Sequence, residues 1–383
     1  MFEGLPREVV RLEDGRYLVT RYQDVLCLLH DPRLSSEAVA KGEGGGGGYV
    51  STTERINLLQ LDPPDHDRVR RIVMRQFGPP ARPFLVHDLE GEMTQIADRL
   101  LDEMAGRNAA ELVSCYAYRL PVAIICKLFG VPLSLEERFR HLVDIIVSGA
   151  GVIPRPPEVN QANRELGILL LGIARERHGQ GGHDILSGLI DDDGPEGRLS
   201  EPSIAAMAVL LLIAGHETTV NLIANGLVTL LRRPDEAARL RRDPDRAIGI
   251  VEELLRFEPP IQFMQNRVTL APVQVGEATI PEGCRVLLLL AAANRDPERF
   301  VDPHRFDPDR GGNEHLGFGS GIHSCFGAAL ARLEGQIALQ RFFARVENPA
   351  LQGEPVYRPS PLLRGPIELR ITYDAIRPSG GAL

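Results

Sequence analysis

The stretch that decides the fold is Phe318-Gly319-Ser320-Gly321-Ile322-His323-Ser324-Cys325-Phe326-Gly327. Glycines stand six and four residues before Cys325 and two residues after it. They allow the backbone to pass close to a bulky, flat group. The following Ala328-Ala329-Leu330-Ala331 begins a helix, and a helix N-terminus favours the thiolate form of a cysteine. The sequence therefore predicts a reactive cysteine beside a planar group.

This stretch has two other interpretations. A lone cysteine is usually a small buried apolar residue. The spacing Gly317-x-Gly319-x-Gly321 faintly resembles a nucleotide-binding loop, but no strand precedes these glycines, so the nucleotide interpretation fails.

Most of the chain before this stretch has helical spacing, which begins near Pro63 and is interrupted by short Pro- and Gly-rich segments. Ser200 can cap a helix with Pro202 in its first turn, and nothing breaks the pattern until Pro234. This predicts a helix of about 33 residues, roughly 50 Å long. Its middle is apolar on all sides, so we expect it to run through the core. A further helix ends near Phe257.

Short strand-like segments accompany the helices. They are Arg16 to Tyr22, Asn266 to Leu270, Gln274 to Val275, Thr279 to Ile280 and Arg285 to Leu290. A meander rich in Pro, Gly and Asp, from Asp296 to Gly312, leads into the cysteine stretch. With neither an internal repeat nor a linker, residues 1–383 are predicted to form a single, mainly α domain with small β-sheets.

Composition excludes several classes of protein. A net charge of -9 and a pI near 5.7 argue against nucleic acid as a partner. The five cysteines contain no C-x-x-C pair, which argues against zinc and iron-sulfur sites, and their odd number fits a reduced, cytoplasmic setting. The N-terminus lacks a signal-peptide pattern. The longest apolar runs, Ile204 to Ala214 and Val286 to Ala293, are shorter than a bilayer requires, so no membrane partner is expected.

The ten residues around Cys325 resemble the signature of the cytochrome P450 family, Phe-Gly-x-Gly-x-His-x-Cys-x-Gly, and meet every fixed position. The length of the match disfavours an inert cysteine. The resemblance implies the cytochrome P450 fold, with haem b between the long central helix and the helix that follows the cysteine. It makes Cys325 the axial ligand to iron, with Gly327 also at the cofactor. A thiolate on haem iron promotes cleavage of the O–O bond.

Glu253-Leu254-Leu255-Arg256 resembles the family's Glu-x-x-Arg motif. Taken alone, a Glu and an Arg three apart on a helix are more often a weak surface pair. Here the pair lies about seventy residues before the cysteine, with Phe306-Asp307-Pro308-Asp309-Arg310 between them. The resemblance then implies that Glu253 and Arg256 lock onto the meander and have a structural role.

Ala214-Gly215-His216-Glu217-Thr218-Thr219 is a polar break in the long apolar helix. Small residues let a planar cofactor and oxygen approach the backbone, and a hydroxyl beside a carboxylate can relay protons. The resemblance assigns Thr218 to the iron-bound oxygen and Glu217 as its acidic neighbour. Alternatively, Thr218 bonds back to its own helix. We expect His216 to be a satisfied core or surface histidine.

His66 and Arg70 lie four residues apart within Asp62-Pro63-Pro64-Asp65-His66-Asp67-Arg68-Val69-Arg70, on one helical face. Buried haem propionates need cationic or hydrogen-bonding partners. By resemblance His66, Arg70, Arg267 and His323 bind them, and an exposed charged helix face is the alternative for the first two. On the same helix Arg68, Arg71 and Arg75 are predicted to form a basic strip where an acidic electron donor docks.

The resemblance implies insertion of one oxygen atom from O2 into a lipophilic small molecule, with secondary metabolism as the expected context. A separate ferredoxin and its reductase are expected to supply electrons to a monomeric enzyme. Oxidative coupling or desaturation on the same haem, and a non-catalytic haem sensor or partner protein, are the alternatives. The residues expected to line the substrate pocket are Ile213, Ala214, Ile261, Phe263, Leu362 and Leu363.

The entrance side of the pocket is where the resemblance weakens. About fifteen residues precede Arg16, where family members usually have a further helix. The loop from about Glu37 to Asp62 contains the glycine run Gly42 to Gly48 and is predicted to be either a substrate lid or a passive linker.

Overall fold

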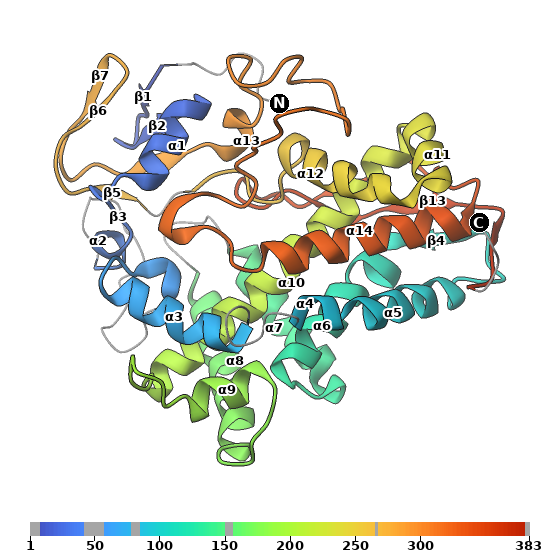
Figure 1. Ribbon diagram of the computed structural model, residues 1–383, viewed down its shortest axis with the longest axis horizontal. Coiled ribbons are helices and arrows are strands. Elements are labelled where there is room, and N and C mark those ends of the chain that lie inside the picture. The colour runs from blue at the N-terminus through green and yellow to red at the C-terminus, as the bar shows by residue number, and fades with distance from the viewer. Residues whose placement is uncertain (1–7, 42–56, 78–84, 150–155, 265–266, 380–383) are drawn as a thin grey trace.

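The computed structural model describes residues 8–41, 57–77, 85–149, 156–264 and 267–379. The expected fold class, mainly α with small β-sheets, is confirmed (Figure 1). The glycine run Gly42 to Gly48 lies outside the described residues, so its predicted role as lid or linker stays a prediction.

The long predicted helix is α10 (Glu201–Leu231), with Ser200 as N-cap accepting a hydrogen bond from the Ser203 amide. Its length and hydropathy also occur in membrane-spanning helices. Here, however, it packs against α6 (Arg119–Phe129), α8 (Pro157–Glu176) and α14 (Ala328–Arg345), as a core helix does. Figure 1 shows α10 running through the middle of the helical body. The apolar composition on all sides is therefore explained by burial within the protein.

The remaining α-helices in the described ranges are shorter. They are α1 (Tyr22–His30), α2 (Glu37–Ala40), α3 (Asp65–Phe77), α4 (Leu85–Asp88), α5 (Glu90–Asp102), α7 (Glu136–Ser148), α9 (Ile185–Asp191), α11 (Pro234–Arg242), α12 (Ala247–Phe257) and α13 (Leu290–Ala293).

The strands are two or three residues long. They are β1 (Val10–Arg11), β2 (Tyr17–Val19), β3 (Leu34–Ser35), β4 (Ala109–Glu111), β5 (Val268–Thr269), β6 (Val273–Val275), β7 (Ala278–Ile280), β8 (Val286–Leu288), β9 (Val346–Glu347), β10 (Ala350–Leu351), β11 (Val356–Tyr357), β12 (Pro366–Glu368), β13 (Arg370–Thr372) and β14 (Ala375–Ile376). Two sheets have three strands, in the orders β1-β2-β8 and β10-β13-β4, and β2 is parallel to β8.

The predicted strands were placed correctly, but their bounds differ. Arg16 to Tyr22 and Arg285 to Leu290 extend beyond β2 and β8, whereas β6 and β7 each begin one residue earlier than predicted. Tyr22 already begins α1, and Leu290 begins α13. The strands after α14 were not predicted, because segments this short carry no periodicity of their own.

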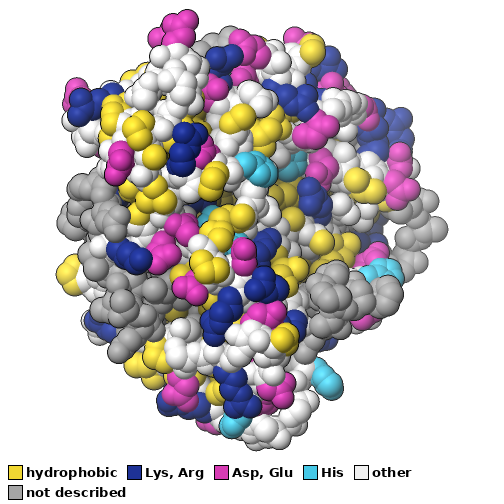
Figure 2. Space-filling model, turned by 60° about the vertical axis from the view of Figure 1, so that its left-hand side comes forward, with side chains coloured by type: hydrophobic (Ala, Val, Ile, Leu, Met, Phe, Trp, Pro, Cys, Tyr) yellow, Lys and Arg dark blue, Asp and Glu magenta, His cyan; other side chains and the backbone are white. Residues whose placement is uncertain are grey.

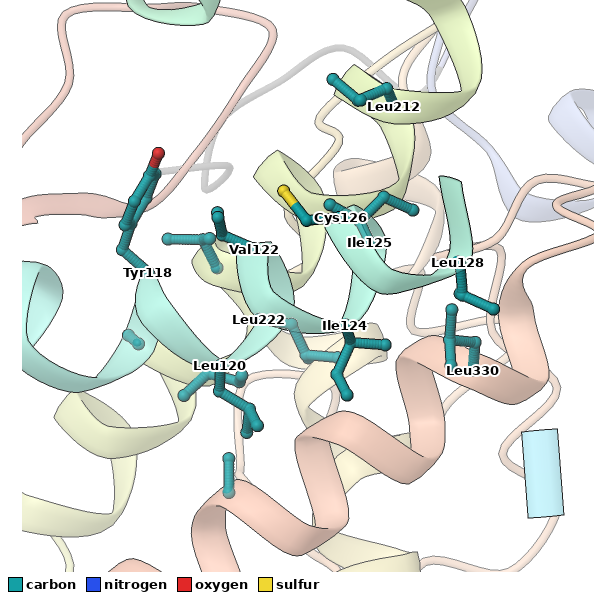
Figure 3. Packing of buried hydrophobic residues seen from close by; sticks show 14 of the residues in the cluster. Tyr118, Leu120, Val122, Ile124, Ile125, Cys126, Leu128, Leu212, Leu222 and Leu330 are labelled. Carbon is teal, nitrogen blue, oxygen red and sulfur yellow. The ribbon is translucent and has the colours of Figure 1, made fainter. Parts of the chain in front are cut away.

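The core lies around α10. Side chains of α6 pack between α10 and α14, as Figure 3 shows for Ile124 beside Leu222 and for Leu128 beside Leu330. A second apolar cluster joins α1 to the β1-β2-β8 sheet and includes Val25, Leu288 and Phe300. The first cluster holds α10 and α14 in a fixed relation, so the polar break of α10 and the loop before α14 are both carried by rigid elements.

Candidate active site

The loop that carries Cys325, residues 317–327, is held by backbone on both sides. A Cβ at Gly317 would lie 2.6 Å from the Leu255 carbonyl oxygen, and one at Gly321 would lie 2.3 Å from the Leu29 carbonyl oxygen. Gly321 also has a φ of +72°. A Cβ at Gly319 would meet nothing within 4 Å. Two of these glycines therefore let the loop contact α12 and the end of α1, a role that the sequence alone did not reveal.

Cys325 lies just before α14, and its amide donates to the Phe318 carbonyl at 3.0 Å. Part of the residue is exposed. Burial nevertheless raises the pKa of the thiol, against the Gly327 amide and the charges of Arg70 and Arg332, which lower it. The amide at the start of α14 does favour the thiolate, as expected, but burial outweighs it in the protein by itself. A bound metal cation deprotonates a coordinating thiol.

The polar break of α10 has an exposed and a buried side. Ala214 is exposed and Thr218 partly so, while Glu217 is buried. The Thr218 hydroxyl donates to the Ala214 carbonyl at 2.9 Å, so this threonine does bond back to its own helix. Oε2 of Glu217 lies 3.5 Å from Nη2 of Arg358. Burial opposes ionisation of Glu217, but His216, Arg358 and Arg140 outweigh it and hold the pKa of this carboxyl below its usual value.

His216 is fully buried, as expected of a core histidine, but it is not fully satisfied. Nδ1 donates to the Leu212 carbonyl at 2.8 Å. Nε2 has no hydrogen-bond partner in the described chain and lies 3.6 Å from Oε1 of Glu217. Sequence reasoning missed this contact because consecutive helical residues do not normally face each other.

The four residues expected at the haem propionates lie on three elements around the cysteine loop. His66 and Arg70 are on α3, Arg267 precedes β5, and His323 is in the short 3-10 turn Gly321–His323. The rings of His66 and His323 are 4.7 Å apart. Arg70 donates to the carbonyls of Ile322 and Ser324, at 3.0 and 3.1 Å. These contacts secure the loop, and the exposed-face alternative fails for His66, which is 1% exposed.

Two buried nitrogens in this group lack a hydrogen-bond partner in the described chain, Nε2 of His66 and Nδ1 of His323. Burial, together with Arg267, His66 and Arg70, lowers the pKa of His323 to about 3, and burial lowers that of Arg267 to about 10. Buried polar groups are rarely left unsatisfied. Unpaired nitrogens beside concentrated positive charge fit a bound group with carboxylates, as haem has.

Glu253 and Arg256 are both fully buried and form two hydrogen bonds of 2.7 Å. Arg256 also donates to carbonyls of the meander and of α13's end, on Asn294, Pro303 and Arg305. A surface pair would show none of this burial. The buried pair therefore binds the meander through hydrogen bonds from Arg256, as the resemblance implied.

The residues expected to line the substrate pocket fall into two groups. Ile261 pairs with Leu363 across an antiparallel bridge, and the Gln262 amide donates to the Leu362 carbonyl at 2.9 Å. Phe263 follows in the same segment and is partly buried. Ile213 lies on α10 next to the exposed Ala214 and packs at the edge of the main core.

The predicted basic strip on α3 is corrected by the structure. Arg75 pairs with Asp192 at 2.8 Å and also with Glu196. Arg71 pairs with Glu196 at 3.0 Å, and Arg68 donates to the Glu196 and Arg198 carbonyls. Acids from the segment before α10 therefore compensate Arg71 and Arg75, whereas Arg68 is held by backbone carbonyls. Basic and acidic side chains are likewise interspersed on the face in Figure 2.

Comparison with known proteins identifies the class. The family model for cytochrome P450 matches residues 175–358. The monooxygenase PikC of Streptomyces venezuelae is 39% identical over 386 residues, covering 98% of this chain and 90% of that one. The 6-deoxyerythronolide B hydroxylase of Saccharopolyspora erythraea is 37% identical over 391 residues, covering 97% and 94%. The solved structure of cytochrome P450 CYP109Q5 from Chondromyces apiculatus superimposes with a TM-score of 0.87 at 33% identity, covering 98% and 94%.

This chain therefore belongs to the cytochrome P450 family, and it is a haem-dependent monooxygenase, an oxidoreductase. The family binds haem b through a cysteine. The orphaned nitrogens of His66 and His323 show that the residues present fit this group.

Proposed function

We propose that this monooxygenase inserts one oxygen atom from O2 into a lipophilic small molecule, with Cys325 as the ligand to haem iron. The observation that carries the proposal is the arrangement of the cysteine loop between α1 and α12, beside two unpaired, buried histidine nitrogens. Haem with a thiolate ligand supplies the activation of O2. His66, Arg70, Arg267 and His323 would hold its propionates, and Gly327 would leave room beside the ligand.

Within this proposal, side chains of the protein accept and release the protons that the reaction needs. Glu217 stays ionised because its pKa is low, and it faces His216 and Arg358. The Thr218 hydroxyl is on the partly exposed side of the same helical turn, next to Ala214. We assign Glu217 to accepting and releasing protons beside His216 and Arg358, and the Thr218 hydroxyl to holding a proton on the partly exposed side of α10.

The substrate proposal is a lipophilic intermediate of secondary metabolism, such as a macrolide. It is supported by the similarity to the 6-deoxyerythronolide B hydroxylase of Saccharopolyspora erythraea. It is also supported by the apolar side chains expected at the pocket, Ile213, Ala214, Ile261, Phe263, Leu362 and Leu363. Product analysis separates hydroxylation from oxidative coupling or desaturation.

Bacterial members of the family use ferredoxin and its reductase as electron donors. We propose the same donors here for a monomeric, cytoplasmic enzyme whose single haem domain comprises residues 1–383. A non-catalytic haem protein would not need the acid and hydroxyl of Glu217 and Thr218, and both are present.

The test is the carbon monoxide difference spectrum of the reduced protein. The wild type is expected to show the band of a thiolate-ligated ferrous haem, and Cys325→Ser is expected to lose it while remaining folded by circular dichroism. Cys284→Ser is the matched control and should keep the band. An unchanged spectrum in Cys325→Ser excludes this cysteine as the ligand.

A further inference from the structure

Behind the proposed propionate ligands lies a group of polar residues to which neither the sequence motifs nor the family resemblance assigned a role. It consists of Ser35, Ser36 and Asp62. Strand β3 pairs with β5 in the register Leu34 to Thr269 and Ser35 to Val268. Antiparallel pairing continued by one residue places Ser36 beside Arg267. Both residues are buried.

Asp62 fixes this corner of the fold. Its carboxylate accepts hydrogen bonds from the Ser35 hydroxyl, from the Ser36 amide at 3.0 Å and from the Glu37 amide at 3.4 Å. It thereby satisfies the N-terminal amides of α2. The Asp62 carbonyl also accepts from the His66 amide, in the first turn of α3. One aspartate thus joins β3, α2 and the helix that carries His66 and Arg70.

Ser36 connects this corner to two of the proposed ligands. Arg267 donates to the Ser36 hydroxyl oxygen, and the same oxygen lies 3.4 Å from Nε2 of His323. A guanidinium has only donors, so Ser36 accepts from Arg267. With Nδ1 of His323 donating to a propionate, as the proposed function requires, Nε2 carries no hydrogen and can only accept from the Ser36 hydroxyl.

An imidazole that accepts at Nε2 carries its hydrogen on Nδ1. Nδ1 of His323 is the buried nitrogen that has no partner in the described chain. A Ser36 hydroxyl that donates to Nε2 would keep the hydrogen on Nδ1, the donor that a propionate oxygen requires.

We propose that Ser36, fixed by Asp62, is a positioning residue for the haem propionates: it orients the Arg267 guanidinium and sets the His323 tautomer so that both donate to the cofactor. This inference rests on the proposed function, because it assumes that haem occupies the site. The acid of Asp62 also compensates the charge of Arg267, whose pKa it raises against the effect of burial.

The test is haem retention, measured as transfer of ferric haem to apomyoglobin, together with the resonance Raman bending bands of the haem propionates. Ser36→Ala should release haem about tenfold faster, because the charged Arg267 guanidinium loses a hydrogen bond and the neutral His323 ring loses its contact at Nε2. Its propionate bands should shift. Ser148→Ala removes an exposed hydroxyl that bonds only within α7's last turn, and it should match the wild type in both measurements.

Two further variants complete the test. One separates the Ser36 hydroxyl from the packing of its side chain, and the other tests the hydrogen bonds of Asp62. Ser36→Thr keeps the hydroxyl and should retain haem like the wild type. Asp62→Asn tests the corner without changing Ser36 and should release haem faster, with shifted propionate bands. Equal haem loss in Ser36→Ala and Ser36→Thr, or release from Ser36→Ala at the control rate with unchanged bands, overturns the inference.

The carbon monoxide spectrum keeps the two proposals distinguishable. A wild type without the thiolate band overturns the proposed function. If the wild type and the variants all show this band, and Ser36→Ala does not change haem release, only the role of Ser36 is overturned.

Discussion

Nε2 of His216 lies 3.6 Å from Oε1 of Glu217, and both side chains are buried. Because Nδ1 bonds the Leu212 carbonyl, the ring presents Nε2 to the carboxylate. The histidine, Arg358 and Arg140 lower the pKa of Glu217 more than its burial raises it. The unfolded chain titrates at the ordinary value, so the stability contributed by ionised Glu217 is present above that value and is lost as pH falls through the lower folded pKa.

Glu217→Gln should therefore destabilise the protein by about 1–3 kcal/mol near neutral pH, and the difference from the wild type should close in acid. Urea unfolding across a pH series measures it. Glu165→Gln removes an exposed partner of Arg138 and should cost less than about 1 kcal/mol. A difference that grows as pH falls would show that Glu217 is not stabilised as a carboxylate.

Thr218→Ala should leave substrate binding intact and divert electrons to hydrogen peroxide, because the hydroxyl that holds the proton is lost. Peroxide and product are measured per electron pair consumed. Thr94→Ala removes a hydroxyl bonded to its own helix at the same 2.9 Å and spacing, and it should not change this ratio. If Thr218→Ala forms as much product per electron pair as the wild type, a group other than Thr218 holds the proton.

Arg256→Met should destabilise the protein by about 3–5 kcal/mol, because the fully buried Glu253 loses its nearer counter-charge and keeps only Arg310, at 3.4 Å. Denaturant unfolding measures the loss. Arg239→Met breaks a pair with Glu236 that has the same spacing but partly exposed side chains, and a contact with the exposed Asp309, so it should cost less than about 1 kcal/mol. Similar losses of unfolding free energy in the two variants would contradict a structural role for the buried pair at the meander.

Gly321→Ala and Gly319→Ala separate close approach from backbone strain. Both glycines have a positive φ, which costs an alanine about 1–2 kcal/mol. Only at Gly321 does the added Cβ also meet backbone, the Leu29 carbonyl. Gly321→Ala should therefore lower the melting temperature and haem content more than Gly319→Ala does. Equal effects would mean that the loop has room at α1.

Arg75→Glu should destabilise the fold more than Arg71→Glu, because Arg75 pairs with the buried Asp192 whereas Arg71 is largely exposed. We expect a loss of about 3 kcal/mol against less than about 1 kcal/mol. Melting temperatures measure this before any assay with ferredoxin. If the Arg75→Glu protein is stable and is reduced slowly by ferredoxin but normally by dithionite, the prediction that the electron donor docks on the basic strip of α3 is supported after all.

Local signals in the sequence determined much of this protein. Ser200, Pro202 and Pro234 fixed the start and end of α10, because capping and proline effects act within one helical turn. The cysteine loop was likewise predicted from its glycines and from its match to the family signature. These features depend on neighbours in the chain, so their physical causes are visible in the residues themselves.

Contacts between distant segments were decided by the tertiary structure alone. Asp192 and Glu196 compensate arginines on α3 that are more than a hundred residues away, so the predicted basic strip was wrong. Ser36 meets Arg267 only because β3 pairs with β5. Glu253 and Arg256 have the spacing of an ordinary surface pair, and packing against the meander buries them. Burial sets the strength of a charge interaction, and burial is a property of the whole fold.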